Sequence, residues 1–325
     1  GANKSFIYVR GELMYVIHIL EKAIAEAKAK GFLGKNILGS GYDLELVVQP
    51  GGGAYICGEE TALLESLEGK RGNPRNKPPF PAVKGLYQSP TVVNNVESIA
   101  TTSWIVNNGG DAYAAIGIGR STGTKLISAS GHIRKPGVYE IELGVPVEDF
   151  IFADEWCGGI RPGHKFKALV AGGSSVPILP SNLALTLANG EKRLMSYESL
   201  SDGGFATGTM LGSGGFIVFD ETACIVRNTW NFSRFYHHES CGQCSPCREG
   251  TGWMEKVLHR IEYGHGHQQD IDLLVDVAKK IEGNTICPLG DAAAWPVASA
   301  IRHFRDEFQW HIDHPAEATQ PGAVY

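Results

Sequence analysis

The chain has 325 residues, enough for two or three domains and for a sizeable core without disulfide bonds. Apolar residues make up 43% and charged residues 20%, a composition that excludes disordered and coiled-coil proteins. The net charge of −6 provides no basic field for nucleic acid, and no apolar run approaches the ~20 residues of a membrane span.

The first part of the chain alternates helix and strand patterns. Apolar residues at three- and four-residue spacing predict a helix over 12–30, and alternation predicts a strand over 42–49. Further helices are expected over 58–68 and from 94 to 107. This alternation is typical of an α/β fold.

A glycine-rich turn at 50–58 joins the predicted strand to the next helix, and it ends in Gly58, Glu59 and Glu60. A strand–turn–helix of this kind suits a nucleotide, although the paired acids disfavour a phosphate at that spot. Their carboxylates can instead accept hydrogen bonds from ribose hydroxyls or a ring N–H. The alternative is that both acids only stabilise the helix N-terminus.

Residues 69–90 contain five prolines and five basic residues but no acid, so we expect an extended segment outside the sheet. Within it, Phe80 is a candidate to stack on a base and Lys77 to meet a phosphate or ribose. The alternative is a proline-rich connector with a solvated basic face.

Two amides, Asn94 and Asn95, begin the helix expected over 94–107. Either one is a candidate N-cap. Side-chain amides at this position are also suited to hydrogen bonding with the ribityl hydroxyls and ring edge of a flavin.

Over residues 121–220 the sequence changes to short strand-like stretches. These indicate a small α+β domain with one short helix at 147–152. The expected strands are 125–130, 138–143, 167–170 and 216–219. From residue 221 the pattern is helical, in about four segments that end near Trp310, and residues 311–325 are expected to form a tail.

Four of the seven cysteines form a ligand pattern, C-x2-C-x2-C followed by a distant fourth cysteine. They are Cys241, Cys244, Cys247 and Cys287. This 3+1 division favours a [4Fe–4S] cluster, because zinc ribbons usually show two separated pairs. Gly242 and Gly250 are expected to bring backbone N–H groups close to the sulfides. The other cysteines, Cys57, Cys157 and Cys224, are expected to be buried thiols.

Five segments together resemble one family, the flavin-bearing, NADH-oxidising (51-kDa-type) subunit of respiratory complex I, NADH:quinone oxidoreductase. The resembling segments are 53–69, 77–82, 93–97, 239–250 and 285–291. They span most of the chain, and several long motifs together are more specific than any one of them.

The resemblance implies α/β and all-α parts. Residues 1–120 would form a Rossmann-like flavin and NADH-binding domain, 121–220 a small β-grasp (ubiquitin-like) domain, and 221–310 a C-terminal helical bundle that holds an iron–sulfur cluster. Residues 311–325 would be the tail.

The resemblance also implies which residues bind each cofactor. Gly58, Glu59, Glu60, Asn94 and Asn95 would line the FMN and nicotinamide site. Lys77 and Phe80 would lie on the dinucleotide side of that site. The cluster would be held by Cys241, Cys244, Cys247 and Cys287.

The implied activity is the oxidation of NADH through FMN, with single electrons passed to the [4Fe–4S] cluster for quinone reduction. The implied partners are a thioredoxin-like [2Fe–2S] subunit and a larger multi-cluster iron–sulfur subunit. The chain would be cytoplasmic and peripheral on the inner face of the cell membrane. One alternative is the flavoprotein subunit of an NAD-dependent formate dehydrogenase or NAD-reducing hydrogenase. Another is a zinc-stabilised, non-catalytic interaction module.

One departure from the family concerns the start of the chain. Family members carry an upstream glycine-rich loop for the flavin phosphate, and this sequence resembles the family only from a later strand onward. We therefore expect the chain to be N-terminally incomplete. A polypeptide that starts at Gly1 is expected to bind FMN weakly or not at all, and still to assemble the cluster.

Overall fold

The computed structural model describes residues 1–319 and divides into two compact units, residues 1–93 and residues from 94 onward. The predicted domain boundaries near residues 120 and 220 both lie within the second unit.

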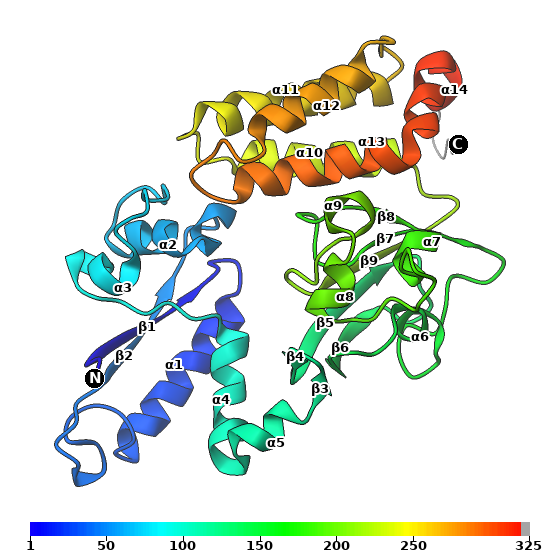
Figure 1. The fold of residues 1–325 in the computed structure, drawn as a ribbon. Helices are drawn as coiled ribbons and strands as arrows, with labels where there is room; N and C mark the ends of the chain where they lie inside the picture. The colour runs from blue at the N-terminus through cyan, green and yellow to red at the C-terminus, as the bar shows by residue number, and fades with distance from the viewer. Residues whose placement is uncertain (320–325) are drawn as a thin grey trace. The chain divides into compact units, whose positions relative to one another are not determined.

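The first unit begins with a β–α–β arrangement (Figure 1), in which β1 (Lys4–Val9) and β2 (Glu45–Pro50) are parallel. The connecting helix α1 (Met14–Ala29) packs on β2 and buries Ile17. The helix predicted over 12–30 and the strand predicted over 42–49 are thus both present, with slightly different ends.

A one-turn 3-10 helix (Tyr55–Gly58) leads into α2 (Glu60–Leu67), as expected for the helix predicted over 58–68. The proline-rich segment 69–90 contains no strand, which confirms that it stays outside the sheet. It is not extended throughout, because it contains α3 (Pro81–Lys84) and a 3-10 turn at Leu86–Gln88. Proline suits the first turn of a helix, where its missing N–H has no intrahelical partner.

The second unit starts with two helices and contains a β-grasp domain. The helices are α4 (Val96–Asn108) and α5 (Gly110–Ala114). The strands are β3 (Gly117–Ile118), β4 (Ser121–Thr122), β5 (Thr124–Gly131), β6 (Gly137–Glu142), β7 (Phe166–Val170), β8 (Leu179–Pro180) and β9 (Gly215–Asp220). The short helices among them are α6 (Val147–Phe152), α7 (Ser181–Leu185), α8 (Tyr197–Ser201) and α9 (Gly204–Thr207).

The main sheet of this domain has the strand order β6-β5-β9-β7-β8. The β5–β6 hairpin is antiparallel, β9 runs parallel to β5, and β7 runs antiparallel to β9. The core between this sheet and α6 is apolar, with the rings of Phe150 and Phe216 in edge contact at 5.1 Å. The predicted β-grasp fold is therefore confirmed.

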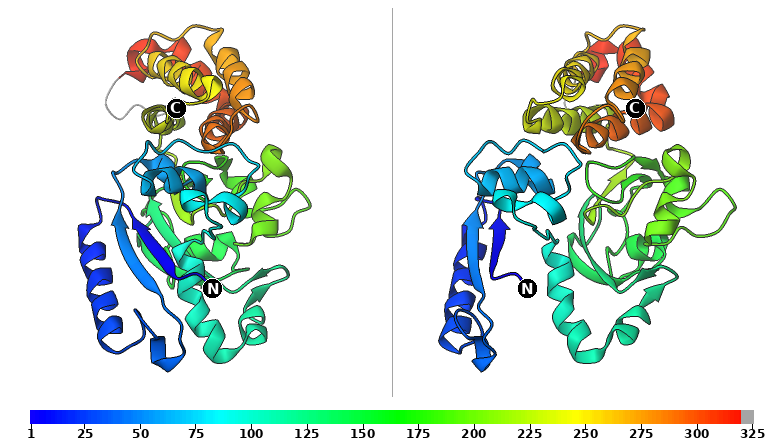
Figure 2. Two further views of the ribbon diagram at one scale, coloured as in Figure 1. Left: turned by 90° about the vertical axis from the view of Figure 1, so that its left-hand side faces the viewer. Right: turned by 60° about the vertical axis from the view of Figure 1, so that its left-hand side comes forward.

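The remainder of the second unit is helical. Its helices are α10 (Ile225–Glu239), α11 (Ser245–Glu262), α12 (Asp270–Ile281), α13 (Leu289–Asp313) and α14 (Pro315–Ala318). The first four lie side by side in a bundle, with α10 against α11 and α13, and α12 against the same two helices (Figure 2). No helix within residues 1–319 is both long and apolar enough to cross a membrane.

The predicted tail, 311–325, begins as helix rather than as irregular chain. Helix α13 continues to Asp313 because its inner face still buries Phe308 and His311. Helix α14 follows, and residues 320–325 lie outside the described residues.

The β-grasp domain and the helical bundle pack on each other within the second unit. The buried hydroxyl of Ser299 on α13 accepts a 2.9 Å hydrogen bond from the backbone N–H of Ile178. The ring of Trp295 stacks on Phe205 with 4.4 Å between centroids. Polar and aromatic contacts together therefore fix α13 against the sheet domain.

Candidate functional site

The N-terminus of α2 is capped by one of the predicted site acids. The Glu59 carboxylate accepts hydrogen bonds from the backbone N–H groups of Thr61 at 2.8 Å and Ala62 at 2.9 Å. These are the donors that a helix N-terminus would otherwise offer to a phosphate. A flavin phosphate therefore does not fit at this helix start, in agreement with the expectation drawn from the paired acids.

Lys77 lies against both acids. Its ammonium group is 3.1 Å from a carboxylate oxygen of Glu59 and 2.5 Å from one of Glu60. Burial raises the pKa of Glu59, but hydrogen bonds from Thr61, Ala62 and Lys77 outweigh it, so its pKa is below the usual range. Glu59 is therefore an ionised hydrogen-bond acceptor at neutral pH.

The proline-rich segment is held against α2 by a half-buried ionic network around Arg75. The Arg75 guanidinium is 2.5 Å from Glu65 and 2.8 Å from Glu68, and it donates to the Gly85 carbonyl at 3.0 Å. The backbone N–H of Arg75 donates to the Thr61 hydroxyl at 2.8 Å. This network fixes the two ends of the stretch that carries Lys77 and Phe80.

Gly58 and Phe80 leave this part of the surface accessible. The Phe80 ring is 57% exposed, and a side chain added at Gly58 would meet no atom within 4 Å. Four predicted site residues, Gly58, Glu59, Glu60 and Lys77, are thus brought together at one helix end. This helix end offers the ionised carboxylate of Glu59 as a hydrogen-bond acceptor, the ammonium group of Lys77 and open space at Gly58. Such a surface suits a ring edge or a ribose rather than a phosphate.

The predicted amides Asn94 and Asn95 belong to the second unit. The Asn95 side chain accepts a 2.8 Å hydrogen bond from the backbone N–H of Glu97 and so caps α4. Asn94 is exposed beside it. The Glu97 carboxylate pairs with Lys125 and accepts from the N–H of Leu126, which anchors this helix start on strand β5.

The four predicted cluster ligands lie at one end of the helical bundle. Cys241 follows α10, Cys244 caps α11, Cys247 sits in its first turn, and Cys287 precedes α13. Three helix ends therefore converge on the ligand set, as expected for a cluster framed by helices.

The four cysteines are not drawn together as closely as the ligands of a single metal ion. Two groups of three or more candidate ligands within residues 1–319 have all their ligand atoms within 4.8 Å of one another, and neither group contains any of these four cysteines. A tetrahedral zinc ion needs its sulfur ligands about 3.8 Å apart. A set of four thiolates divided 3+1 in the sequence is the donor chemistry of a [4Fe–4S] cluster, and the wider separation of these cysteines agrees with it.

Arg248 shapes the cysteine loop by donating to the Gly242 carbonyl at 2.9 Å, while Gly242 itself has a φ of +78° that favours glycine. Gly250 has a different role from the one predicted. It lies inside α11, where an added Cβ would be 2.6 Å from the side chain of Ile281 on α12. This glycine serves the close packing of two helices.

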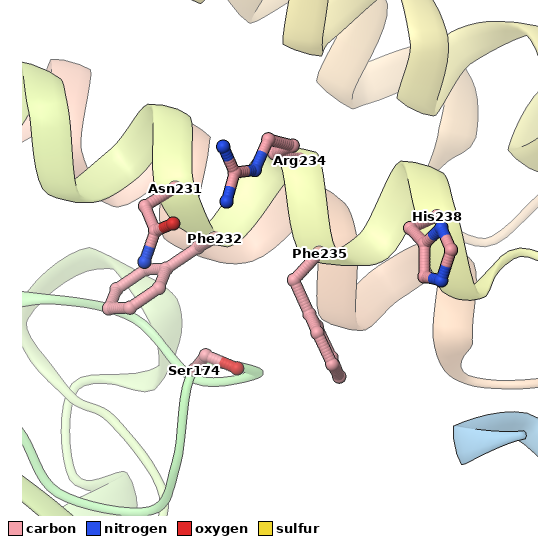
Figure 3. Close-up of a pocket in the computed structure, with 6 residues that line it drawn as sticks. All are labelled: Ser174, Asn231, Phe232, Arg234, Phe235 and His238. Carbon is pink, nitrogen blue, oxygen red and sulfur yellow. The ribbon is translucent and has the colours of Figure 1, made fainter. Parts of the chain in front are cut away.

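A hollow of about 610 Å³ lies between the β-grasp domain and α10 (Figure 3). Its lining consists of Ser174, Asn231, Phe232, Arg234, Phe235 and His238. None of the predicted flavin, NADH or cluster residues lines it, so it is distinct from the sites described above.

A buried group at the other end of the bundle escaped the sequence analysis. Cys224, Glu262 and His311 converge there from three helices. Burial raises the pKa of the Cys224 thiol to about 12 and lowers that of His311 to about 4. Their separations of 38 and 87 residues form no motif, so no sequence signal marks them as a group. The expected burial of Cys57, Cys157 and Cys224 is confirmed.

Comparison with known proteins supports both parts of the candidate site. Residues 1–104 match the Nuo51 FMN-binding domain, and residues 227–311 match the NADH-ubiquinone oxidoreductase-F iron-sulfur binding region. The predicted FMN-binding and [4Fe–4S] regions are thereby confirmed.

The chain is 50% identical over 313 residues to the F subunit of the NADH-quinone oxidoreductase of Mycobacterium tuberculosis. The aligned region covers 96% of this chain and 67% of that protein. It is 49% identical over 313 residues to the corresponding protein of Rickettsia typhi, covering 96% and 71%. Among solved structures, it resembles an NAD+-reducing [NiFe]-hydrogenase in the H2-reduced state, with a TM-score of 0.82 and 33% identity. That likeness covers 96% of this chain, which spans 50% of the hydrogenase chain.

Proposed function

This chain belongs to the family of NADH-quinone oxidoreductase F subunits, and we propose that it is an electron-input subunit of such a complex. It oxidises NADH through FMN and passes single electrons to a [4Fe–4S] cluster for quinone reduction. The observation that carries this proposal is the presence in one chain of a matched FMN-binding region and of a matched iron–sulfur region that holds all four cysteines.

The two cofactors, when bound, supply the chemistry, because FMN accepts a hydride and returns electrons singly to an iron–sulfur cluster. The protein's own residues bind and orient. Glu59 and Glu60 would accept hydrogen bonds from ring or ribose donors, and Lys77 holds both carboxylates in place through ion pairs. Phe80 provides an exposed ring for stacking on the dinucleotide. Asn94 and Asn95 would offer side-chain amide groups to the flavin, as the family resemblance implies.

The proposed partners are a thioredoxin-like [2Fe–2S] subunit and a larger multi-cluster iron–sulfur subunit. Together they would carry electrons from this chain toward the quinone. The chain would lie peripherally on the cytoplasmic face of the cell membrane, attached through the membrane subunits of the complex.

The test is NADH-dependent reduction of the cluster in the assembled complex, followed by electron paramagnetic resonance. We expect NADH to produce a reduced [4Fe–4S] signal and NADH-dependent quinone reduction. In a Glu59→Gln variant, NADH should reduce the cluster more slowly, while dithionite, which bypasses the flavin, reduces it fully. A wild-type cluster that dithionite reduces but NADH does not would contradict the proposal.

A second candidate is the diaphorase-type subunit of a soluble NAD-linked enzyme, favoured by the likeness to the NAD+-reducing [NiFe]-hydrogenase. Deleting the gene separates the two. Loss of NADH:quinone activity from membranes supports the first candidate. Loss of hydrogen- or formate-dependent NAD+ reduction from the soluble fraction supports the second.

A further inference from the structure

Three side chains of the types that bind metal ions lie close together in the interior of the helical bundle. The Cys224 sulfur is 3.3 Å from Nε2 of His311 and 3.8 Å from a carboxylate oxygen of Glu262. That same oxygen is 3.8 Å from Nδ1 of His311. Exposed fractions are 6% for Cys224, 1% for Glu262 and 1% for His311, so the group is sealed from solvent.

One polar atom in this group lacks a partner. Nδ1 of His311 is buried without a hydrogen-bond partner and lies 3.8 Å from the Glu262 carboxylate, while Nε2 of the same ring faces the Cys224 sulfur. We propose that Cys224, Glu262 and His311 form a second metal site and bind a structural zinc ion.

The spacing of the ligand atoms fits zinc. With Zn–S near 2.3 Å and Zn–N or Zn–O near 2.1 Å, the edges of a tetrahedral site are about 3.4–3.6 Å. The Cys224 sulfur is 3.3 Å from Nε2 of His311 and 3.8 Å from the Glu262 oxygen, and both separations lie close to these edges, so Nε2 is the ligand nitrogen. A thiolate, an imidazole and a carboxylate form a mixed set that suits borderline-soft Zn²⁺ better than Mg²⁺ or Ca²⁺. A water molecule takes the fourth position.

Charges around the group are compatible with the ion. Arg227 pairs with the other oxygen of Glu262, which leaves the oxygen facing Cys224 and His311 available. Glu307, also packed nearby, is 2.9 Å from Lys167 and accepts from the N–H of Ile225, so it is already neutralised. Zn²⁺ with a thiolate and the Glu262 carboxylate is neutral overall, and binding releases the thiol proton.

The position of the group gives the site a structural role. Cys224 caps the start of α10, Glu262 ends α11, and His311 lies near the end of α13. The cluster cysteines lie at the opposite ends of the same three helices. Fifteen-residue α10 separates the two sites by about 22 Å at 1.5 Å per residue. Zinc would therefore link the three helices at one end of the bundle, and the cluster would link them at the other end.

The experiment uses the full chain, purified from zinc-replete medium with its cluster loaded. We expect about one zinc per chain by elemental analysis. Zinc K-edge absorption should show one sulfur neighbour and three lighter ones. A shell of four sulfurs would instead show zinc in the cluster cysteines, and that result overturns the proposal, as does the absence of zinc.

Variants locate the ion. Cys224→Ser, His311→Gln and the milder Glu262→Gln should each lose the zinc while keeping the iron and the cluster spectrum, which reports that the bundle is folded. Cys157→Ser removes another buried thiol, and His303→Gln removes another histidine of α13; both should keep the zinc. Zinc retained in all three ligand variants would overturn the assignment. If a variant does not fold, the absorption spectrum of the wild-type protein still decides the matter.

Discussion

The carboxylate of Glu68 accepts three hydrogen bonds, from Lys70 at 2.7 Å, from Arg75 at 2.8 Å and from the backbone N–H of Tyr87 at 2.8 Å. Burial alone would raise its pKa, but these donors lower the pKa to about 2. Glu68 therefore joins the end of α2 to both ends of the segment that carries Lys77 and Phe80.

Glu68→Gln should reduce the free energy of unfolding at pH 7 by about 2 kcal/mol, after allowance for solvent screening. Because the folded pKa lies below the usual 4.5, this stabilisation is present above pH 4.5 and is lost as pH falls toward 2. Thermal unfolding of the wild-type protein and of Glu68→Gln, from pH 7 to pH 2, measures this difference in stability. Glu21→Gln, on the exposed side of α1, is the control. A deficit that stays constant with pH would contradict the ionic explanation.

Phe80→Ala should raise KM for NADH several-fold and lower kcat less. Stacking contributes about 1 kcal/mol, and it acts on ground state and transition state alike. NADH oxidation with ferricyanide measures both constants without the quinone step. Val83→Ala removes an exposed apolar side chain from the same segment and should leave KM unchanged. An unchanged KM in Phe80→Ala would show that Phe80 does not stack on the dinucleotide and only belongs to the connecting segment.

Sequence reasoning identified the acids and the cation of this region but not how they are held. Glu59 and Glu60 had two interpretations, and the structure confirms for Glu59 that it stabilises the helix N-terminus, since it caps α2 with one oxygen and pairs with Lys77 through the other. Binding of a ring edge or ribose by these acids stays a prediction. No sequence pattern pointed to Arg75. Its partners lie seven and ten residues away in the chain, and they meet only because the proline-rich segment folds back on α2.

Within the bundle, α11 and α12 pack closely against each other at Gly250. A methyl group there would be 2.6 Å from the buried side chain of Ile281, so neither can move without disturbing the core. Gly250→Ala should therefore destabilise the second unit by about 1–2 kcal/mol, because overpacking outweighs the better helix propensity of alanine. Chemical unfolding monitored by circular dichroism is the measurement.

Two variants test that explanation. Gly110→Ala places a methyl group in open space at the start of α5 and should be neutral or slightly stabilising. Ile281→Ala removes the atoms that clash, so the double variant should be more stable than the sum of the single effects predicts. Simple additivity would mean that Gly250 is required for another reason.

Helices and strands with a clear hydrophobic periodicity were predicted correctly from the sequence. The short helix at Val147–Phe152 and the strands β5, β6, β7 and β9 lie where the sequence pattern placed them, within one or two residues. The two-residue strands β3, β4 and β8 were missed because alternation needs more residues to be recognised. The parallel pairing of β5 with β9 is set by contacts far apart in sequence, and only the family resemblance indicated it.

The division of the molecule into two units separates the predicted site residues. Gly58, Glu59, Glu60, Lys77 and Phe80 belong to the first unit, while Asn94, Asn95 and the four cluster cysteines belong to the second. Loss of the cluster should therefore leave the acid and lysine site of the first unit intact. The two redox steps can be tested independently in one protein.

Cys287→Ala should abolish the [4Fe–4S] centre. Three cysteines lie from the end of α10 to the first turn of α11, and Cys287 lies just before α13, so its loss removes both a ligand and the tie that the cluster makes to α13. Metal binding is coupled to folding, and the bundle should melt at a lower temperature in the variant. NADH oxidation by ferricyanide should persist while the NADH-reduced cluster signal disappears from the electron paramagnetic resonance spectrum of the assembled complex. Cys157→Ala, which removes a buried thiol of the β-grasp domain, should keep that signal. A normal cluster signal in Cys287→Ala would show that the fourth ligand is another residue, and the 3+1 assignment would then be wrong.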